Sequence, residues 1–314
     1  MLRTALALTV LFVAPSAFAQ QAPSSATPPV GPDWTKVNVT TTDLGNRTYM
    51  LSNGMSGNVT IAVGDDGVIM VDGQHAPMHE KLKAAIAAVT PQPIKFLINT
   101  HIHGDHTGGN LAFAKDGVTI VAHENVKKRL AAGVTSNTTG AVSPPVAAEA
   151  LPSKTYDGDG TTVEVKGRVA QLKHYRRAHT DGDTYVYFAD ANVLSTGDTF
   201  NNGRYQNSDW VNGGNLKGMI AVADVYLTIG NDQTKIVPGH GSLANKAQLK
   251  EFRDMMTTSL DRMTALIKDG KVKSEAEAIE LKPFTDLDPK WAANEQSART
   301  WIRIVYNSAK ANLE

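Results

Sequence analysis

Seven histidine and aspartate residues in this 314-residue chain have the types and the spacing of metal ligands. Four of them, His101, His103, Asp105 and His106, fall within six residues directly after the apolar run 94–98. Neutral imidazole nitrogens and carboxylate oxygens are the donors that zinc takes at hydrolytic centres, where one position stays open for water. A polar surface turn is the alternative for this cluster, but ligands of the same kind follow downstream. They are His179, Asp198 and His240, each in a loop after an apolar run.

The set is large enough for two metals that share one bridging ligand. Residues two apart on an extended segment point to the same side, so His101 and His103 can both face one metal. Past the turn at Gly104, Asp105 and His106 can face a neighbouring one. Two divalent ions about 3.5 to 4 Å apart can share a hydroxide and stabilise different atoms of a substrate. The pattern therefore indicates metal-assisted hydrolysis, which needs no serine or cysteine nucleophile.

In their order along the chain, these seven residues resemble the ligand signature of the metallo-β-lactamase superfamily, and the resemblance covers nearly all of the mature chain. It implies that His179 completes the first metal site, that His240 completes the second, and that Asp198 bridges them. It also implies an α+β fold of the αββα four-layer sandwich type, with the metals at one edge between the sheets. Asp105 would orient the hydroxide and is the predicted catalytic residue.

Short strands and amphipathic helices must position these ligands. Residues 48–51, 59–63 and 68–71 are β-rich runs separated by turn signals, and they predict an antiparallel meander. Residues 136–154 have little periodicity and predict a long loop of the kind that forms lids or stays disordered. Strands followed by helices, twice over, indicate two stacked sheets with helices outside. The further strands are predicted at 94–98, 118–121, 161–175, 184–188 and 193–195, and the helices at 79–89, 124–132 and 249–267, after a capping box at Ser274 and Glu277, and around Trp301.

Composition limits the partners of the chain. Formal net charge is zero and the pI is about 7.1, so there is no electrostatic footprint for nucleic acid. The predicted partner is a small-molecule substrate, and the sequence predicts no oligomeric state. There is no cysteine, so thiolate ligands and disulfides are excluded and stability must come from the packed core.

The first 19 residues predict an export signal. Arg3 precedes a short apolar core at 5–14, and residues 17–19 form a small-x-small cleavage site. This core is well below the roughly 20 residues of a membrane span, so no membrane anchor is expected after cleavage. Residues 20–36 then predict a flexible leader and residues 37–314 a single hydrolase domain, periplasmic or secreted.

Four further residues are predicted to support the metals or the substrate. Ligating imidazoles need an acceptor for their second ring nitrogen, and Asp72 and Asp183 are the candidates. The resemblance places an acidic residue at the position of Asp183, whereas a plain turn role is the alternative for Asp72. His75 lies in a loop that the family uses at the rim of the site, and Tyr205 either lines the pocket or belongs to the core. The other histidines, His79, His123 and His174, are predicted to be surface or helix-cap residues.

Two zinc ions are the predicted cofactors, although similar sites also take iron or manganese. The leading prediction for function is a zinc-dependent hydrolase of the class B β-lactamase type, in which the metal-bound hydroxide attacks a cyclic amide. The alternative is a lactonase or thioesterase, because the motif 196–199 is similar to that of such enzymes and an added carboxylate lowers the charge on the metal pair. An iron-dependent sulfur dioxygenase is the third hypothesis. The intact ligand set argues against a non-catalytic binding module.

Overall fold

The computed structural model describes residues 32–313, and its elements are as follows. The predicted export signal, 1–19, and the leader up to residue 31 lie outside the described residues. The strands are β1 (Thr40–Gly45), β2 (Thr48–Ser52), β3 (Val59–Val63), β4 (Val68–Val71), β5 (Ile94–Ile98), β6 (Thr119–His123), β7 (Val134–Thr135), β8 (Val142–Ser143), β9 (Lys154–Tyr156), β10 (Gly160–Val165), β11 (Arg168–His174), β12 (Thr184–Phe188), β13 (Val193–Ser195) and β14 (Lys235–Val237). The helices are α1 (His79–Ala87), α2 (Gly104–Thr107), α3 (Asn110–Lys115), α4 (Glu124–Ala132), α5 (Leu216–Thr228), α6 (Lys246–Lys268), α7 (Glu275–Leu281), α8 (Asp288–Trp291) and α9 (Glu295–Ala311), with 3-10 turns at Trp34–Lys36, Ala76–Met78, Ala148–Ala150, Gly197–Thr199 and Trp210–Asn212.

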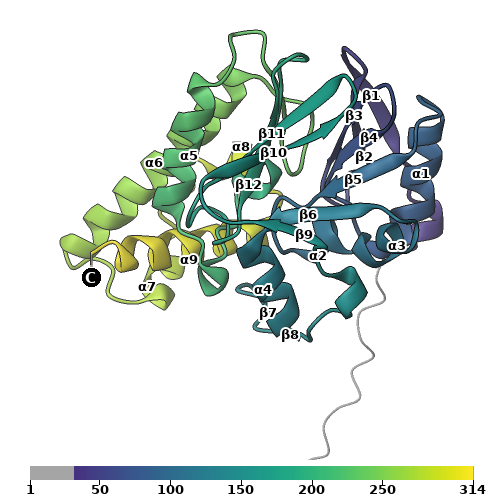
Figure 1. Cartoon of the computed structure of the whole chain (residues 1–314). Coiled ribbons are helices and arrows are strands. Elements are labelled where there is room, and N and C mark those ends of the chain that lie inside the picture. The colour runs from purple at the N-terminus through teal and green to yellow at the C-terminus, as the bar shows by residue number, and fades with distance from the viewer. Residues whose placement is uncertain (1–31, 314) are drawn as a thin grey trace, which may run out of the picture. The chain divides into compact units, whose positions relative to one another are not determined.

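Two sheets organise the compact unit Lys36–Glu314 (Figure 1). The first has the order β1-β2-β3-β4-β5-β6-β9, and its first four strands form the predicted antiparallel meander. From β4 onward its strands run parallel. The second sheet has the order β10-β11-β12-β13-β14, antiparallel except for the parallel pair β13 and β14.

Apolar side chains from both sheets form one core between them. Ile69, Val71 and Ile98 of the first sheet belong to the same buried cluster as Leu172 and Val186 of the second. Strand β11 alternates strictly between buried and exposed residues, as expected for a strand with one face on the core and one in solvent. Strands β3 and β4 are buried throughout, which fits a sheet covered on both faces.

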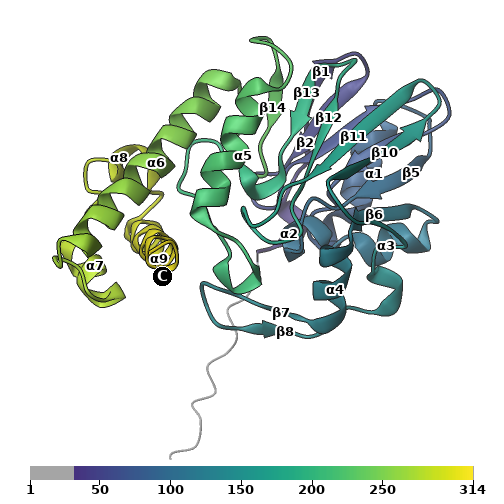
Figure 2. The ribbon, with the colours of Figure 1, turned by 60° about the vertical axis from the view of Figure 1, so that its left-hand side comes forward.

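Helices cover the outer faces of both sheets, which gives the predicted αββα sandwich (Figure 2). Helices α1 and α3 lie outside the first sheet, and α5, α6 and α9 lie on the side of the second. The latter three pack on one large cluster that includes Phe252 and Trp301, both essentially inaccessible to solvent. Within the described residues no helix is both long enough and apolar enough to span a membrane.

The sequence missed several short elements and one long helix. Helix α5 buries Leu216, Met219, Val222, Ala223 and Tyr226, a helical stripe that the sequence analysis did not recognise. The segment 136–154, predicted to be a loop, contains β8 and a 3-10 turn, and β8 pairs with β7 to form a small hairpin. Strands of two residues are too short to show any periodicity, so pattern alone could not find them.

Candidate metal centre

The predicted ligands follow strands that end at one edge of the two sheets. Asp72 follows β4, and His101 comes three residues after the end of its parallel neighbour β5. Asp198 and His240 follow the second parallel pair, β13 and β14, in the same way. His179 lies in the loop between β11 and β12. Open sheets place binding sites at the carboxyl ends of parallel strands, and here two such pairs supply ligands to one place.

The first cluster consists of His101, His103, His179 and Asp198, with one ligand atom of each within 4.8 Å of the others. His103 Nδ1 lies 3.0 Å from His179 Nε2. The ring of His101 stands nearly perpendicular to both of these rings, at centroid distances of 4.9 and 4.6 Å. Nitrogens that converge in this way match the donor arrangement of a metal site.

The second cluster consists of Asp105, His106 and His240, again with ligand atoms within 4.8 Å of one another. His240 Nε2 lies 3.0 Å from Asp105 Oδ2 and 3.4 Å from His106 Nε2. His106 is fully buried, whereas the side chains of Asp105 and His240 are 24% and 13% exposed. In the first cluster the side chain of His103 is 21% exposed, so each cluster has a ligand that solvent reaches.

Asp198 faces both clusters with different oxygens. Its Oδ2 lies 3.8 Å from His179 Nε2, and its Oδ1 lies 3.1 Å from His106 Nε2 and 3.4 Å from His240 Nε2. A Cβ on residue 239 would come within 2.0 Å of Asp198 Oδ1, so Gly239 is what allows the backbone to approach this carboxylate. The geometry is that of the bridging position which the family resemblance implies.

One carboxylate orients a histidine in each cluster. Asp72 Oδ2 accepts from His106 Nδ1 at 2.8 Å and from the Thr100 hydroxyl at 2.8 Å. The same hydroxyl oxygen lies 2.9 Å from His101 Nδ1 and accepts its proton. Both rings are thereby turned so that Nε2 points into the centre, which is the supporting contact predicted for Asp72.

Two orienting groups were not found from the sequence. Asp209 Oδ2 accepts from His103 Nε2 at 2.9 Å, and the Asn207 carbonyl accepts from His179 Nδ1 at 2.6 Å. Both come from the segment 201–214, where the sequence marks Tyr205, Trp210 and Asn212 as candidates but neither of these two residues. No spacing or motif marks them, because their role depends on which ring nitrogen of each histidine faces the metal centre.

Unsatisfied hydrogen-bonding atoms support a metal site independently of the sequence motif. His101 Nε2 is buried and has no hydrogen-bond partner among the described residues, although the other nitrogen of the ring is fully used. Asp198 Oδ1 is also buried and makes no hydrogen bond within that part of the chain. Buried polar atoms are nearly always satisfied, so two unpaired donor atoms that face the same clusters fit the ligand set of a metal site.

Electrostatics differ between the two clusters. Burial lowers the pKa of His179 to about 4, and burial with the neighbouring imidazoles lowers the pKa of His101 well below its usual value. Burial also opposes a charge on His106, but three surrounding carboxylates outweigh it and raise the pKa of that ring, Asp198 most strongly. His101 and His179 therefore favour neutral nitrogens, whereas a metal at His106 must compete with a proton.

Asp183 does not accept from an imidazole, which corrects its predicted role. Its carboxylate accepts from the backbone N–H of His179 at 2.6 Å and from both the N–H and the hydroxyl of Thr180. Burial raises the pKa of Asp183 to about 7 despite these donors. Because the chain turns back on itself between residues 179 and 183, this carboxylate fixes the loop that carries His179 and leaves the ring to Asn207.

Tyr205 belongs to the core, which is the second of the two alternatives that the sequence leaves open for it. Its ring stacks on Trp301 at 5.0 Å, and its hydroxyl donates to Asp288 at 2.7 Å. His75 lies closer to the centre, where the charges of Asp105, His106 and His240 act on it, and it contacts Ser56 through Nδ1 at 2.8 Å.

The three remaining histidines are buried, and none is a surface residue. His123 does cap a helix, because its Nδ1 accepts from Asn125 N–H at the start of α4. His174 stacks on His123 with ring centroids 3.7 Å apart. His79 opens α1 and contacts Asp116 at 2.9 Å.

Two cavities border the centre. A cavity of about 410 Å³ is lined in part by His103 and a second, of about 610 Å³, in part by His240. Each therefore touches one ligand, from the first and the second cluster respectively. Volumes of this size are those of small-molecule sites.

Residues 52–240 match the sequence profile of the metallo-beta-lactamase superfamily. This span is more than half of the chain and contains all seven candidate ligands. The chain therefore belongs to the metallo-beta-lactamase superfamily, which consists of metal-dependent hydrolytic enzymes.

Two relatives are similar in sequence. The chain is 29% identical over 174 residues to the 2,4-dinitroanisole O-demethylase subunit alpha of Nocardioides sp. (strain JS1661), a match covering 55% of this chain and 49% of that protein. It is also 29% identical over 246 residues to the hydroxyacylglutathione hydrolase of Polaromonas sp. (strain JS666 / ATCC BAA-500), covering 76% and 78%. The chain spans about half the length of the first relative and most of the second.

Solved structures of metallo-beta-lactamases share the fold. The enzyme from Pontibacter korlensis has a TM-score of 0.58 at 20% identity, over 70% of this chain and 99% of that one. The DIM-1 metallo-beta-lactamase has a TM-score of 0.56 at 16% identity, over 71% and 98%. This likeness establishes the architecture.

Proposed function

We propose that this protein hydrolyses an acyl bond of the ester, thioester or lactone class at a centre that holds two zinc ions. The observation that carries the proposal is Asp198, whose two oxygens face different ligand clusters. The similarity to a hydroxyacylglutathione hydrolase over 78% of that protein supports the same class. The small-molecule substrate would enter beside Asp105 and His103, the two most exposed of the candidate ligands.

Divalent ions bound by such a donor set lower the pKa of water and polarise a carbonyl group. The residues of the chain would do the positioning. Asp72 and Thr100 accept hydrogen bonds from the outward nitrogens of His106 and His101, so that the inward nitrogens are the ones that face a bound metal. Asp105 carries a pKa below its usual value because His106 and His240 outweigh the effect of burial, so it stays ionised and can accept a hydrogen bond from the attacking water.

The choice of an ester over a β-lactam follows from charge. From the sequence alone, a cyclic amide is the leading substrate prediction and an ester is the alternative. In the structure Asp198 adds its negative charge to a centre that already contains Asp105 and is flanked by Asp72 and Asp209. Each added carboxylate reduces the positive field that would stabilise a departing amide nitrogen, whereas an alkoxide or thiolate leaves more easily. We therefore place the ester class first and keep the β-lactam as its competitor.

Steady-state kinetics on zinc-loaded protein test this choice. Nitrocefin, a lactone, a thioester and a p-nitrophenyl ester would be compared by kcat/KM, with the ester class expected to exceed the β-lactam by at least about tenfold, or about 1.4 kcal/mol. Asp105→Ala should abolish turnover and leave the circular dichroism spectrum unchanged, with the exposed Asp157→Ala as matched control. A higher kcat/KM for nitrocefin than for the esters would favour the cyclic amide as substrate. Full turnover by Asp105→Ala would show that Asp105 is not catalytic.

Metal content tests the cofactor separately. We expect two zinc ions per chain after maturation in the periplasm, measured by mass spectrometry of the metals. Iron together with oxygen consumption would favour the sulfur dioxygenase hypothesis over hydrolysis. Fractionation of cells that express the full chain tests the predicted export, for which a periplasmic or secreted product is expected.

A further inference from the structure

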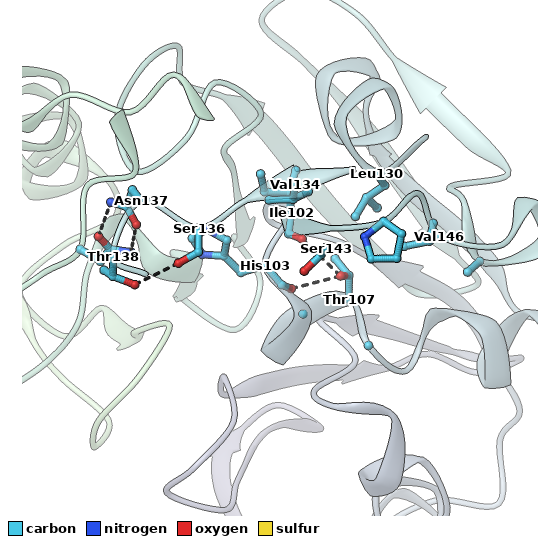
Figure 3. Close-up of a pocket in the computed structure, with 15 residues that line it drawn as sticks. Ile102, His103, Thr107, Leu130, Val134, Ser136, Asn137, Thr138, Ser143 and Val146 are labelled. Atoms are coloured by element: carbon cyan, nitrogen blue, oxygen red, sulfur yellow. Dashed lines mark hydrogen bonds between the residues drawn. The ribbon is translucent and has the colours of Figure 1, made fainter. Parts of the chain in front are cut away.

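The cavity beside His103 has two ends of different chemistry (Figure 3). Ile102, Leu130, Val134 and Val146 line one end together with Thr107 and Ser143. The other end carries uncharged polar side chains alone, Ser136, Asn137 and Thr138. Of the described residues that line it, His103 alone has an ionisable side chain. A charged group would lose its hydration there without gaining a partner, so the cavity selects against charge.

The β7–β8 hairpin forms one wall of the cavity, and hydrogen bonds hold it in place. Asn137 Nδ2 donates to Asn207 Oδ1 at 2.9 Å and to the Ser208 carbonyl at 3.1 Å. Asn212 Nδ2 donates to the Thr135 carbonyl at 2.8 Å. These contacts connect the hairpin to the segment whose Asn207 carbonyl orients His179, so hydrogen bonds link this wall of the cavity to the first cluster.

The cavity beside His240 has a different lining. It includes the exposed cationic side chain of Arg204 and mostly small or polar residues, with Met50 and Leu243 as its large apolar side chains. An apolar substituent would gain little there. If a substrate spans the centre, its uncharged apolar part belongs in the cavity beside His103.

We propose that the cavity between α2, α4 and the β7–β8 hairpin is a specificity subsite for an uncharged aliphatic or aromatic acyl substituent. This inference rests on the proposed acyl hydrolysis and names its substrate class. The apolar end is contiguous with His103, so a chain attached to a carbonyl group at the centre would extend along Ile102 toward Val146 (Figure 3). Its burial in apolar surroundings should raise kcat/KM about fourfold per methylene group until the cavity is full.

A chain-length series tests the subsite in turnover. On zinc-loaded protein, p-nitrophenyl hexanoate should exceed the acetate by more than tenfold in kcat/KM, and the hemisuccinate ester should fall below the butyrate. Val146→Trp fills the cavity from its partly exposed wall and should remove most of the hexanoate advantage while leaving acetate hydrolysis within about twofold. Val142→Trp is the matched control, because Val142 lies in β8 only four residues before Val146, is 72% exposed and does not line the cavity.

A binding measurement separates this inference from the proposed function. Hexanamide is uncharged, and its addition should shift the methyl NMR signals of Val134 and Val146, whereas acetamide should not. Val146→Trp should abolish the effect. If no ester is hydrolysed but hexanamide binds in this way, the proposed reaction fails and the subsite stands. If esters are hydrolysed with no dependence on chain length, or if Val146→Trp and Val142→Trp behave alike, the subsite is refuted and the hydrolase stands.

Discussion

The two ligand clusters shift the pKa values of their histidines in opposite directions. The first cluster is rich in imidazole, and burial keeps the rings of His101 and His179 neutral. In the second cluster the carboxylates raise the pKa of His106 and, against the effect of burial, that of His240. The two clusters, which meet at Asp198, therefore differ in whether a metal must displace protons from the histidines.

The difference shows that a ligand set does not by itself fix affinity. In the first cluster burial favours the neutral rings of His101 and His179, so these two histidines offer nitrogen lone pairs without losing a proton. The second offers a stronger negative field, but a cation must compete there with protons drawn by the same carboxylates. We expect the first cluster to be the more constant site and the second to be the one that responds to pH.

Removal of Asp198 should have the largest effect, because it serves both clusters. Asp198→Ala deletes the carboxylate that faces His179 with one oxygen and His106 with the other. A bound ion contributes several kcal/mol of charge stabilisation, so kcat/KM should fall on the order of a thousandfold. Zinc content measured after dialysis should fall below one ion per chain. Retention of two ions would show that the clusters bind independently and that Asp198 does not bridge.

The residues that converge in the two clusters could be predicted from the sequence, because their chemistry lies in residue type and local spacing. His101, His103, Asp105 and His106 are close in sequence, and the apolar run before them forms β5 with the bounds expected. Strands β3, β12 and β13 and helix α4 also match the sequence prediction residue for residue. Contiguous apolar runs between turn residues are the signal that one sequence carries best.

The supporting contacts could not be predicted, because they depend on orientation in space. Asp183 and Asp209 are both acidic residues near the centre, yet only Asp209 receives an imidazole proton. What separates them is the direction of each ring, which is settled by packing across the whole fold. The sequence could not decide between pocket and core for Tyr205 for the same reason, since its stacking partner Trp301 lies on a helix far along the chain.

The response to pH would sharpen the comparison most directly. As pH falls from 7 toward 5.5, the raised pKa values of His106 and His240 mean that two protons compete at the second cluster. Zinc affinity there should fall by up to about a hundredfold per pH unit, tenfold for each proton displaced. His179, with a pKa of about 4, stays neutral over this range. Equilibrium dialysis in buffered zinc should therefore show a decline from two ions to one, and a simultaneous loss of both would contradict the proposed asymmetry.

Asp209 tests how strongly the first cluster depends on orientation. Asp209→Ala removes the acceptor for His103 Nε2, so the ring can turn and its Nδ1 leaves the centre. Loss of such a partner usually costs about 10-fold to 100-fold in metal affinity or activity. Asp209→Asn keeps an acceptor oxygen and should retain more zinc than the alanine variant in a competition titration with a chelator. Equal losses in the two variants would point to the charge of Asp209 and not to its geometry.

The smallest effect is expected outside both clusters, at His123. His123→Ala removes the cap of α4 and should lower the free energy of unfolding by about 1 kcal/mol while kcat/KM stays unchanged. His123→Asn can restore the cap and should recover part of the loss in urea denaturation. Burial, with the neighbouring His174, lowers the pKa of His123 to about 4, so the neutral ring stabilises the fold at high pH and that contribution is lost as pH falls below the usual value of 6.5. The difference between wild type and His123→Ala should therefore narrow from pH 7 to pH 5. A gap that widened instead would mean that the ring is protonated in the folded protein.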